Sequence, residues 1–228
     1  MFDEYMYKTE LHSHTSPVSA CSHIPPEHLV DVYAQKGYTS VVITNHFMYD
    51  GCDAPEEKIE RYLSDYHKAK KYAEKYNLNV ILGCEARVSE NFNDYLIYGI
   101  DEKDLYTIEA ALDNDIKGFY KKIKNNDNII FQAHPFRDGM ELADLNSIDG
   151  IEAFNLHPKH NSRVAVAARY ARENNLQIIC GTDYHDEGSD ALCSILTKIP
   201  VTNSKQLALI LKKKEYIMEI SGYKILID

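Results

Sequence analysis

The chain has 228 residues, of which 44% are hydrophobic and 26% are charged, and its formal net charge at pH 7 is −10. These proportions are typical of a globular protein, and the acidic balance argues against a nucleic-acid polymer as partner, because a broad basic face is the usual footprint of such binding. No stretch of the sequence is long and apolar enough to span a membrane, so no membrane partner is expected.

The cysteines and the first residues indicate a cytoplasmic protein. The five cysteines are odd in number, widely spaced and free of CxxC patterns, which is typical of reduced thiols. The N-terminal stretch MFDEYMYKTE is polar and contains no hydrophobic signal-peptide segment. We therefore expect a cytoplasmic protein with one domain over residues 1–228, and the sequence leaves its oligomeric state open.

Strands and helices are predicted to alternate along the first half of the chain. A strand over 7–14 (YKTELHSH) precedes a helix over 25–37, which has prolines at its start and a glycine at its end. The strand predicted over 39–46 is continuous in apolar residues, as a buried parallel strand should be. A long helix over 56–77 and a strand over 79–86 follow.

The second half continues this alternation, and its first strand, over 93–100, is interpreted as antiparallel or as a barrel excursion. About seven β/α units over this length favour a small barrel, with a doubly wound open sheet as the alternative. Neither GxGxxG nor GxxxxGK[ST] follows the first strand, so no nucleotide-binding fingerprint supports the open sheet. The remaining predicted elements are strands over 128–135, 148–155 and 176–185, helices over 113–126, 160–175 and 204–214, and two closing strands within 216–228.

Metal-ligand side chains stand where the predicted strands end. His12 and His14 end the first strand, and residues i and i+2 of a strand point to the same face, so their imidazoles should lie side by side. The ends of parallel strands share one rim, so we expect all such side chains to converge. Buried imidazole and carboxylate are costly unless paired or coordinated, which favours a metal site. The later strand ends carry His46, Glu85, His134, Asp183 and His185.

The ligand types restrict the metal and its chemistry. Imidazole combined with carboxylate suits Zn, Mn or Fe and does not suit Ca. Seven ligands exceed the need of one tetrahedral ion, so two or three divalent ions are expected, with Glu85 as the bridge. Closely spaced ions clamp the attacking and leaving oxygens of a phosphoryl centre and make hydroxide available near neutral pH. The pattern therefore predicts hydrolysis of a small phosphorylated substrate.

The ordered set of motifs resembles the PHP (polymerase and histidinol phosphatase) family. The resemblance implies a distorted (β/α)7 TIM-like barrel with a metal site at the C-terminal ends of the strands. It also implies a metal-dependent phosphoesterase. The motifs are HxH at 12–14, TNH at 44–46, GCE at 83–85, AHP at 133–135 and GTDYH at 181–185.

The resemblance also implies how the ligands divide among the ions. The first ion would be held by His12, His14, Glu85 and Asp183. Glu85 and His134 would hold a second ion, and His46 and His185 would hold a third.

The sequence departs from the family pattern at three places. The second motif of the family usually reads TDH, and Asn45 lacks the charge that would tune His46. Trinuclear members have a further ligand shortly after the HxH, for which His23 is the better candidate and Cys21 the weaker one. The second ion often gains a ligand between the third and fourth motifs, and Asp101 is the local candidate.

Arg137, in AHPFR, is the expected substrate-binding residue, because its fork of donors fits a phosphate. For Arg137, a surface salt bridge is an equally good interpretation. Arg163 lies at the start of a predicted helix, and for this residue a surface salt bridge is favoured over substrate binding. His157 and His160 lie in a loop expected near the same rim, where they contact either substrate or solvent.

Together these features predict a phosphatase that hydrolyses a small phosphate ester, histidinol-phosphate-like or nucleotide-like, with a metal-activated hydroxide. Asp183 and Glu85 are the expected catalytic residues, and Asp183 or a metal-bound water handles the proton. The alternative is a catalytically weak metal-binding module with a structural or regulatory role. Hydrolysis of C–N bonds is less favoured, because no lysine ends a strand where amidohydrolase barrels usually carry a carboxylated lysine.

Overall fold

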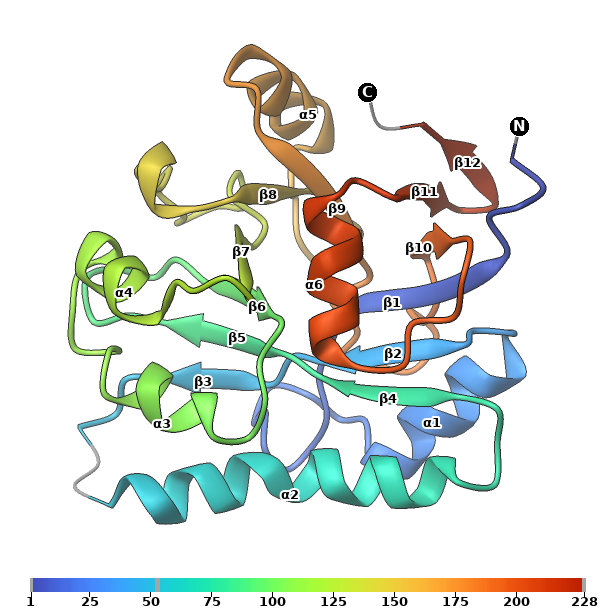
Figure 1. Ribbon diagram of the computed structural model, residues 1–228, viewed down its shortest axis with the longest axis horizontal. Coiled ribbons are helices and arrows are strands. Elements are labelled where there is room, and N and C mark those ends of the chain that lie inside the picture. The colour runs from blue at the N-terminus through green and yellow to red at the C-terminus, as the bar shows by residue number, and fades with distance from the viewer. Residues whose placement is uncertain (1, 52–53, 227–228) are drawn as a thin grey trace.

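The chain folds into two six-stranded sheets in a computed structural model that describes residues 2–51 and 54–226 (Figure 1). Cys52 and the last two residues of the predicted closing strands lie outside the described residues. The first sheet has the order β12-β11-β10-β1-β2-β4. Its strands are Tyr7–Ser13 (β1), Ser40–Ile43 (β2), Asn79–Leu82 (β4), Cys193–Thr197 (β10), Tyr216–Ile220 (β11) and Tyr223–Ile225 (β12).

The second sheet has the order β3-β5-β6-β7-β8-β9. In it, β6 is antiparallel to both neighbours, as one interpretation of the sequence expected, while β7, β8 and β9 run parallel. Its strands are His46–Met48 (β3), Cys84–Arg87 (β5), Tyr95–Tyr98 (β6), Ile129–Gln132 (β7), Gly150–Asn155 (β8) and Gln177–Gly181 (β9).

Two stretches of chain pass from the first sheet into the second. Thr44 and Asn45 separate β2 from β3, and Gly83 alone separates β4 from β5. On the other side, an isolated bridge between Ser13 and Tyr184 joins the end of β1 to the segment after β9. The fold is therefore mixed α/β, and closure into one (β/α)7 barrel stays a prediction, because the hydrogen bonds divide the strands between two sheets.

An apolar core fills the space between the two sheets. Leu11 and Val42 of the first sheet pack with Leu96 and Phe131 of the second and with Leu207 of α6, and all five are fully buried. Helices α1 and α2 lie together below β2 and β4 in Figure 1, and α6 crosses in front of β1 and β2. The helices are Pro26–Gln35 (α1), Pro55–Ala73 (α2), Asp104–Glu109 (α3), Ile116–Ile123 (α4), Val164–Glu173 (α5) and Ser204–Lys212 (α6), with a 3₁₀ turn at Leu145–Ser147.

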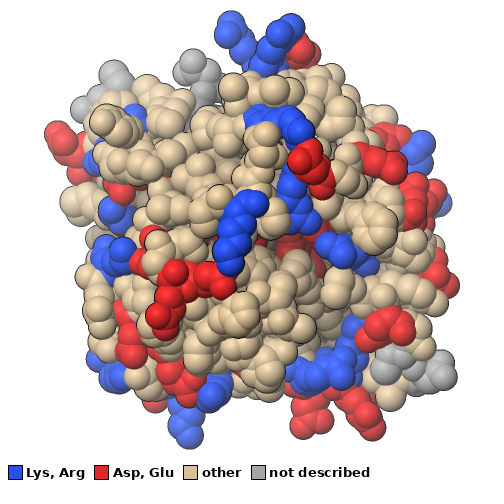
Figure 2. Space-filling model, turned by 180° about the vertical axis from the view of Figure 1, so that it is seen from behind, with Lys and Arg blue, Asp and Glu red and all other residues tan. Residues whose placement is uncertain are grey.

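The helices and the surface charge of the described residues bear on the expectations about partners. Every helix within residues 2–51 and 54–226 is too short or too polar to cross a bilayer. On the face seen in Figure 2, lysine and arginine side chains are interspersed with acidic ones instead of forming one continuous basic area. The expected absence of a nucleic-acid partner stays a prediction.

Candidate metal centre

The seven predicted ligands come together where the two sheets meet. His12 lies in β1, His46 begins β3 and Glu85 lies in β5. The other four follow the ends of β1, β7 and β9. All seven are buried except His46, which is partly buried. The structure thus brings the ligand set into one place, and the role of each residue as a metal ligand stays a prediction.

Glu85 occupies the middle of this cluster. Its Oε1 lies 3.3 Å from His12 Nε2 and 3.2 Å from His134 Nε2. Its Oε2 lies 2.8 Å from His46 Nδ1 and 3.3 Å from His14 Nε2. One fully buried carboxylate therefore contacts four imidazoles, which is the position that a bridging carboxylate would take.

Asp183 is the second carboxylate of the cluster. Its Oδ1 lies 3.4 Å from His12 Nε2 and 3.3 Å from both His14 Nε2 and His185 Nδ1. The backbones of Asp183 and His134 have φ of +54° and +29°, in the left-handed region that side chains other than glycine seldom adopt. Backbone strain of this kind tends to be kept at functional sites.

Two of the histidines are held by their outer nitrogen. His12 Nδ1 is 2.8 Å from Glu152 Oε1, and His185 Nδ1 is 2.9 Å from the carbonyl oxygen of Asp183. A carboxylate and a carbonyl oxygen accept here, so each Nδ1 carries a hydrogen, and Nε2 is the nitrogen of each ring that is left to face a metal ion. Metal-binding histidines are oriented in this way by their outer partners.

His14 is fixed by a short chain of hydroxyl and amide groups. The Ser19 hydroxyl donates to Asn45 Oδ1 at 2.9 Å, so it accepts from His14 Nδ1 at 3.2 Å. Asn45 Nδ2 donates to Thr15 Oγ1 at 2.8 Å, and that hydroxyl donates to Asp65. Asn45 therefore serves the loop after β1, where its amide is needed as a donor, and it makes no described hydrogen bond to the ring of His46.

Burial and charge separate the protonation states in the cluster. Burial lowers the pKa of His12, but the carboxylates of Glu152 and its neighbours outweigh it and raise that pKa well above its ordinary value. Burial, together with the nearby His185, holds the pKa of His14 well below its ordinary value. Burial raises the pKa of Glu85, but the surrounding imidazoles hold it well below its ordinary value.

The donor set fits divalent ions. His12 Nε2 and His14 Nε2 face each other at 3.0 Å, and Glu85 Oε2 is buried without an aligned hydrogen bond among the described residues. Nitrogen and oxygen lone pairs that converge in this way are suited to Zn, Mn or Fe. Three groups have ligand atoms within 4.8 Å of one another: His12, His14 and Asp183; His14, His46 and His185; and His46, Glu85 and Asp94.

The structure does not bring His23 and Asp101 to the cluster. The His23 side chain is 78% exposed and pairs with Asp186, with 2.8 Å between Nδ1 and Oδ1. Asp101 is exposed beyond the far end of β6. Because β6 runs antiparallel to β5 and β7, its start lies beside Glu85 and His134, and its end lies at the opposite edge.

Asp94, just before β6, is an acidic residue beside the cluster that the sequence analysis missed. It is fully buried and receives two hydrogen bonds from Arg87, at 2.7 Å from Nε and 2.8 Å from Nη2. Arg137 Nη2 lies 3.8 Å from the same carboxylate, and Arg137 Nη1 lies 3.5 Å from His134 Nε2. Two arginines therefore share one buried carboxylate at the edge of the cluster.

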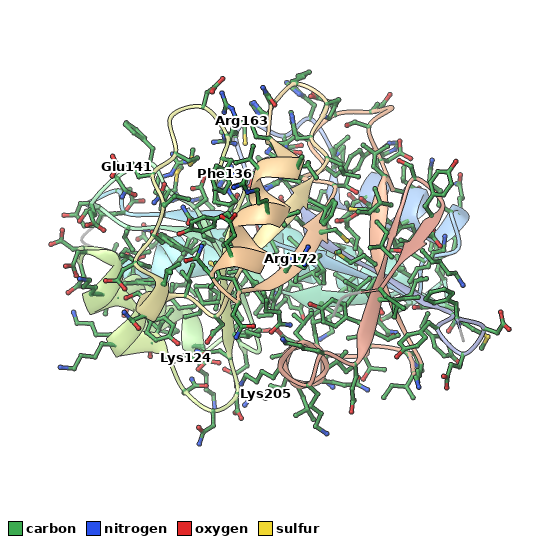
Figure 3. The ribbon with its side chains drawn as sticks, turned by 90° about the horizontal axis from the view of Figure 1, so that it is seen from above. Lys124, Phe136, Glu141, Arg163, Arg172 and Lys205 are labelled. Carbon is green, nitrogen blue, oxygen red and sulfur yellow. The ribbon has the colours of Figure 1, made fainter. Side chains whose placement is uncertain are left out.

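Arg163 has a structural partner instead of a free guanidinium. It donates to the Phe136 carbonyl at 2.6 Å and to Asp138 Oδ1 at 2.5 Å, so it holds the loop that carries Arg137. Figure 3 shows Arg163 and Phe136 close together, at the edge of the molecule opposite Lys124 and Lys205.

Two histidines of a loop lie at the rim of the cluster. The His157 ring is stacked on His160, with 4.2 Å between centroids, and meets His185 edge-on at 5.3 Å. Burial lowers the pKa of His157 to about 4, so this ring is neutral near pH 7. Arg137 adds to the effect of burial in lowering the pKa of His160.

A hollow of about 820 Å³ opens beside His46. Its walls are largely apolar, and Phe92, which is 71% exposed, stands at its edge together with Met48. Arg87 and Cys21 also line it. The hollow is large enough for the organic part of a small substrate next to the metal cluster.

Comparison with known proteins finds solved structures that share the fold of this chain. A two-domain protein from Bacteroides vulgatus, which contains a predicted PHP-like metal-dependent phosphoesterase, matches with a TM-score of 0.71 and 16% identity over 97% of this chain and 67% of that one. A proposed metal-dependent phosphoesterase from Bifidobacterium adolescentis matches with a TM-score of 0.56 and 14% identity over 90% and 96% of the two chains.

An amidohydrolase from Chromobacterium violaceum, solved with bound sulfate and no metal, matches with a TM-score of 0.52 and 16% identity over 80% of this chain and 89% of that one. A search of curated proteins finds no match. At these identities the solved structures show a shared fold alone. The sequence profile of the PHP domain matches residues 10–222, nearly the whole chain, and the chain therefore belongs to the PHP domain family.

Proposed function

We propose that this chain is a cytoplasmic metal-dependent phosphatase that hydrolyses a small phosphate ester. The observation that carries the proposal is the buried cluster around Glu85 and Asp183, with Arg87 and Arg137 at its edge. Imidazole and carboxylate donors suit divalent ions, and arginine pairs suit the oxygens of a phosphate. Two or three ions, Zn, Mn or Fe, would be held by the seven predicted ligands.

Bound divalent ions would neutralise phosphate oxygens and lower the pKa of water, which supplies a nucleophile near neutral pH. The protein's own groups have separate tasks. Arg137 and Arg87 bind the non-bridging oxygens of the substrate, and Glu152 orients the imidazole of His12. Burial raises the pKa of Asp183, but His12 and other imidazoles hold it well below its ordinary value, so its carboxylate stays ionised and can hold a metal ion or accept a hydrogen bond from the attacking water.

The hollow beside His46 is the proposed place for the organic part of the ester. Its mixture of apolar wall and arginine suits a compact leaving group that also carries polar atoms. His157 and His160 stack on each other beside His185, at the rim of the cluster, and are proposed as further substrate contacts.

The proposal is tested with the purified full chain, loaded with Mn or Zn, on p-nitrophenyl phosphate. We expect turnover in the wild type and its loss in His12→Ala and Asp183→Asn. His67→Ala is the matched control, because this exposed histidine pairs with Glu102 on the surface, away from the cluster. Full activity in both site variants contradicts the assignment of these ligands. If activity is lost as expected, a panel of phosphate esters identifies the substrate.

Hydrolysis of a C–N bond is the second candidate, since one structural neighbour is an amidohydrolase. The arginines beside the cluster favour phosphate ester hydrolysis. Their guanidinium groups are suited to the charged oxygens of a phosphate, and an amide group carries no such charge. Amide substrates in the same assay distinguish the two candidates. A folded, metal-loaded chain that turns over neither class supports a structural or regulatory module.

A further inference from the structure

We propose that Asp94 is a positioning residue that holds Arg87 and Arg137 together as a two-armed binding site for the phosphate group of the substrate. The inference rests on the proposed function, because it takes a phosphate as the group on which the metal centre acts. It assigns Asp94 a task other than binding an ion, although its carboxylate lies within 4.8 Å of ligand atoms of His46 and Glu85.

The sheet places Asp94 between the two arginines. It directly precedes β6, which lies between β5 and β7 and is antiparallel to both. Arg87 is the last residue of β5, and Arg137 lies in the loop after β7. The carbonyl oxygen of Asp94 also accepts from the backbone nitrogen of Ala133 at 2.9 Å. The backbone of Asp94 is therefore fixed at a point from which its carboxylate reaches both neighbours.

Asp94 makes a two-point contact with Arg87 and a looser one with Arg137. Its Oδ1 accepts from Arg87 Nε at 2.7 Å, and its Oδ2 accepts from Arg87 Nη2 at 2.8 Å. Arg137 Nη2 lies 3.8 Å from the same Oδ2. A guanidinium has five N–H donors, so Arg87 keeps three for another acceptor. Among the described residues, the Arg137 guanidinium has no acceptor nearer than His134 Nε2 at 3.5 Å.

Burial separates the anchoring carboxylate from the donors that remain for a ligand. The side chain of Asp94 is fully buried, whereas those of Arg87 and Arg137 are 26% and 21% exposed. A buried carboxylate needs a partner of opposite charge, and Arg87 supplies it. Arg87 also lines the hollow beside His46. The anion is therefore inside, and on the Arg87 side the cationic end is accessible from the hollow.

The charges of the three side chains favour an anionic ligand over a further cation. Two guanidinium groups share one carboxylate, which leaves an excess of one positive charge. A divalent ion bound to Asp94 would stand next to both guanidinium groups and be repelled by them. Both oxygens of the carboxylate are also engaged by Arg87 already. These contacts favour the holding of arginines over the ligation of an ion.

The benefit of such an arrangement is preorganisation. Planar forks of donors match the oxygens of a phosphate, but a free arginine loses conformational entropy when it binds one. A fork that a carboxylate already fixes loses less, so it binds the phosphate more tightly. The loop of Arg137 is fixed as well, because Arg163 donates to the carbonyl oxygen of Phe136 at 2.6 Å.

Binding of inorganic phosphate to the metal-loaded full-length protein, measured by calorimetry, tests the proposal. Both oxygens of Asp94 accept from Arg87, so in Asp94→Asn the amide must turn its NH₂ group toward one of these donors. We expect this variant to bind phosphate about 10-fold more weakly, the effect of losing one hydrogen bond to a charged group. Its metal content, measured by elemental mass spectrometry, should equal that of the wild type. Asp101→Asn, at an exposed carboxylate, is the matched control and should change neither quantity.

A double-mutant cycle distinguishes positioning from a general structural effect. If Asp94 acts through the arginines, Asp94→Asn should weaken phosphate binding several-fold less in an Arg137→Ala background than in the wild type. Circular dichroism and the midpoint of thermal unfolding report whether each variant is folded. Arg87→Lys is the second variant, because lysine keeps the charge and lacks the two-point contact, and it should also lower phosphate affinity several-fold.

Wild-type phosphate affinity in folded Asp94→Asn or in Arg87→Lys overturns the proposal, and so does an equal loss in both backgrounds of the cycle. Loss of bound metal from Asp94→Asn also overturns it, because Asp94 would then be an ion ligand. Since the readout is binding and not turnover, the two proposals fail separately. A chain that binds phosphate through these arginines and hydrolyses no ester would contradict the proposed function and leave the role of Asp94 intact.

Discussion

Glu152 is the residue on which the orientation of His12 depends. Its Oε1 holds His12 Nδ1, and its Oε2 accepts from the backbone nitrogen of His134 and from Asn155 Nδ2, both at 3.0 Å. Every partner of this carboxylate is a donor. In Glu152→Gln, either orientation of the amide places one NH₂ group against a donor, so the hydrogen bonds cannot all be kept.

We expect Glu152→Gln to weaken metal binding by about 10–100-fold, the usual effect of removing an outer partner of a metal-binding histidine. The measurement is a competition with a chromophoric chelator. Glu173→Gln, which removes an exposed carboxylate paired with Arg169, should leave the affinity unchanged. Equal affinities in the two variants would show that Glu152 has no part in holding His12.

Arg137 allows a prediction about the substrate. Its guanidinium lies beside His134 and the carboxylate of Asp94, and it is 21% exposed, so it can reach a bound phosphate. A hydrogen bond to a charged group is worth about 1.5–3 kcal/mol, so Arg137→Ala should lower kcat/KM by about 10–100-fold. Metal content should stay at the wild-type level, and Arg169→Ala should match the wild type in both respects.

Arg137→Lys separates charge from geometry at the same position. Lysine keeps the charge but lacks the planar fork of donors, so we expect it to recover only part of kcat/KM. Full recovery would indicate a general electrostatic effect, and loss of metal from Arg137→Ala would indicate a structural role instead of a substrate contact.

At the scale of strands and helices, the rule that ligands stand at strand ends holds for parallel strands and fails for β6. The predicted ligands at 46, 85, 134 and 183 follow from apolar strand runs that end in polar residues, and the structure brings all of them together. The strand over 93–100 obeys the reverse rule, because an antiparallel strand presents its start to the same rim. Asp94 was missed for this reason, and Asp101 was chosen instead.

Functional residues in the middle of a strand were missed, because the sequence analysis looked for ligand-type side chains only where strands end. Glu152 interrupts an otherwise apolar stretch of β8, which is the one pattern that could have marked it, whereas Glu10 lies in a largely polar strand and nothing around it marks it. The short elements β10 and α3 were not predicted, because five or six residues contain too little periodicity to distinguish them from a loop.

The close contact between β9 and its neighbours depends on Gly181, the last residue of that strand. A Cβ atom at this position would lie 2.2 Å from Glu152 Oε1 and 2.5 Å from His12 Cβ. Neither neighbour can move without losing the hydrogen bond between them. The absence of a side chain at 181 therefore lets β9 approach the cluster.

Gly181→Ala should destabilise the fold by about 1–3 kcal/mol, the usual cost of overpacking a buried position, and should weaken metal binding as well. Urea unfolding and chelator competition measure the two effects. Gly139→Ala is the control for metal binding, because nothing lies within 4 Å of the corresponding Cβ. Wild-type metal affinity in Gly181→Ala would show that the cluster tolerates the displacement.

At the scale of the whole molecule, alternation of strands and helices was sufficient to predict a mixed α/β fold, and the ordered motifs were needed to identify it as the PHP type. It was not sufficient to predict how the sheet divides, because that depends on where strands bend. The runs over 39–46 and 79–86 each read as one strand, but each changes sheets within a few residues. Periodicity in a sequence does not record such a bend, since both halves remain apolar.

Glu10 links three parts of the molecule and makes their stability depend on pH. This fully buried carboxylate accepts from Tyr33 of α1 and from Thr182 after β9, in addition to two backbone nitrogens of β1. Burial outweighs these donors and raises its pKa to about 7 from an ordinary value of 4.5. The folded chain therefore binds this proton more tightly than the unfolded chain does.

Between about pH 4.5 and 7 the folded state holds more protons at Glu10, so its contribution to stability is fully present below about pH 4.5 and is lost by about pH 7. A shift of this size corresponds to about 3 kcal/mol. Glu10→Gln should remove this part of the pH dependence, so that the free energy of unfolding of the variant rises relative to that of the wild type as pH rises.

Urea unfolding of chelator-treated wild type and variant at pH 5, 6, 7 and 8 measures the difference. Glu4→Gln, at an exposed carboxylate, should reproduce the pH dependence of the wild type. Parallel curves for Glu10→Gln and the wild type would mean that this carboxylate is ionised in both states, with its five donors outweighing the cost of burial.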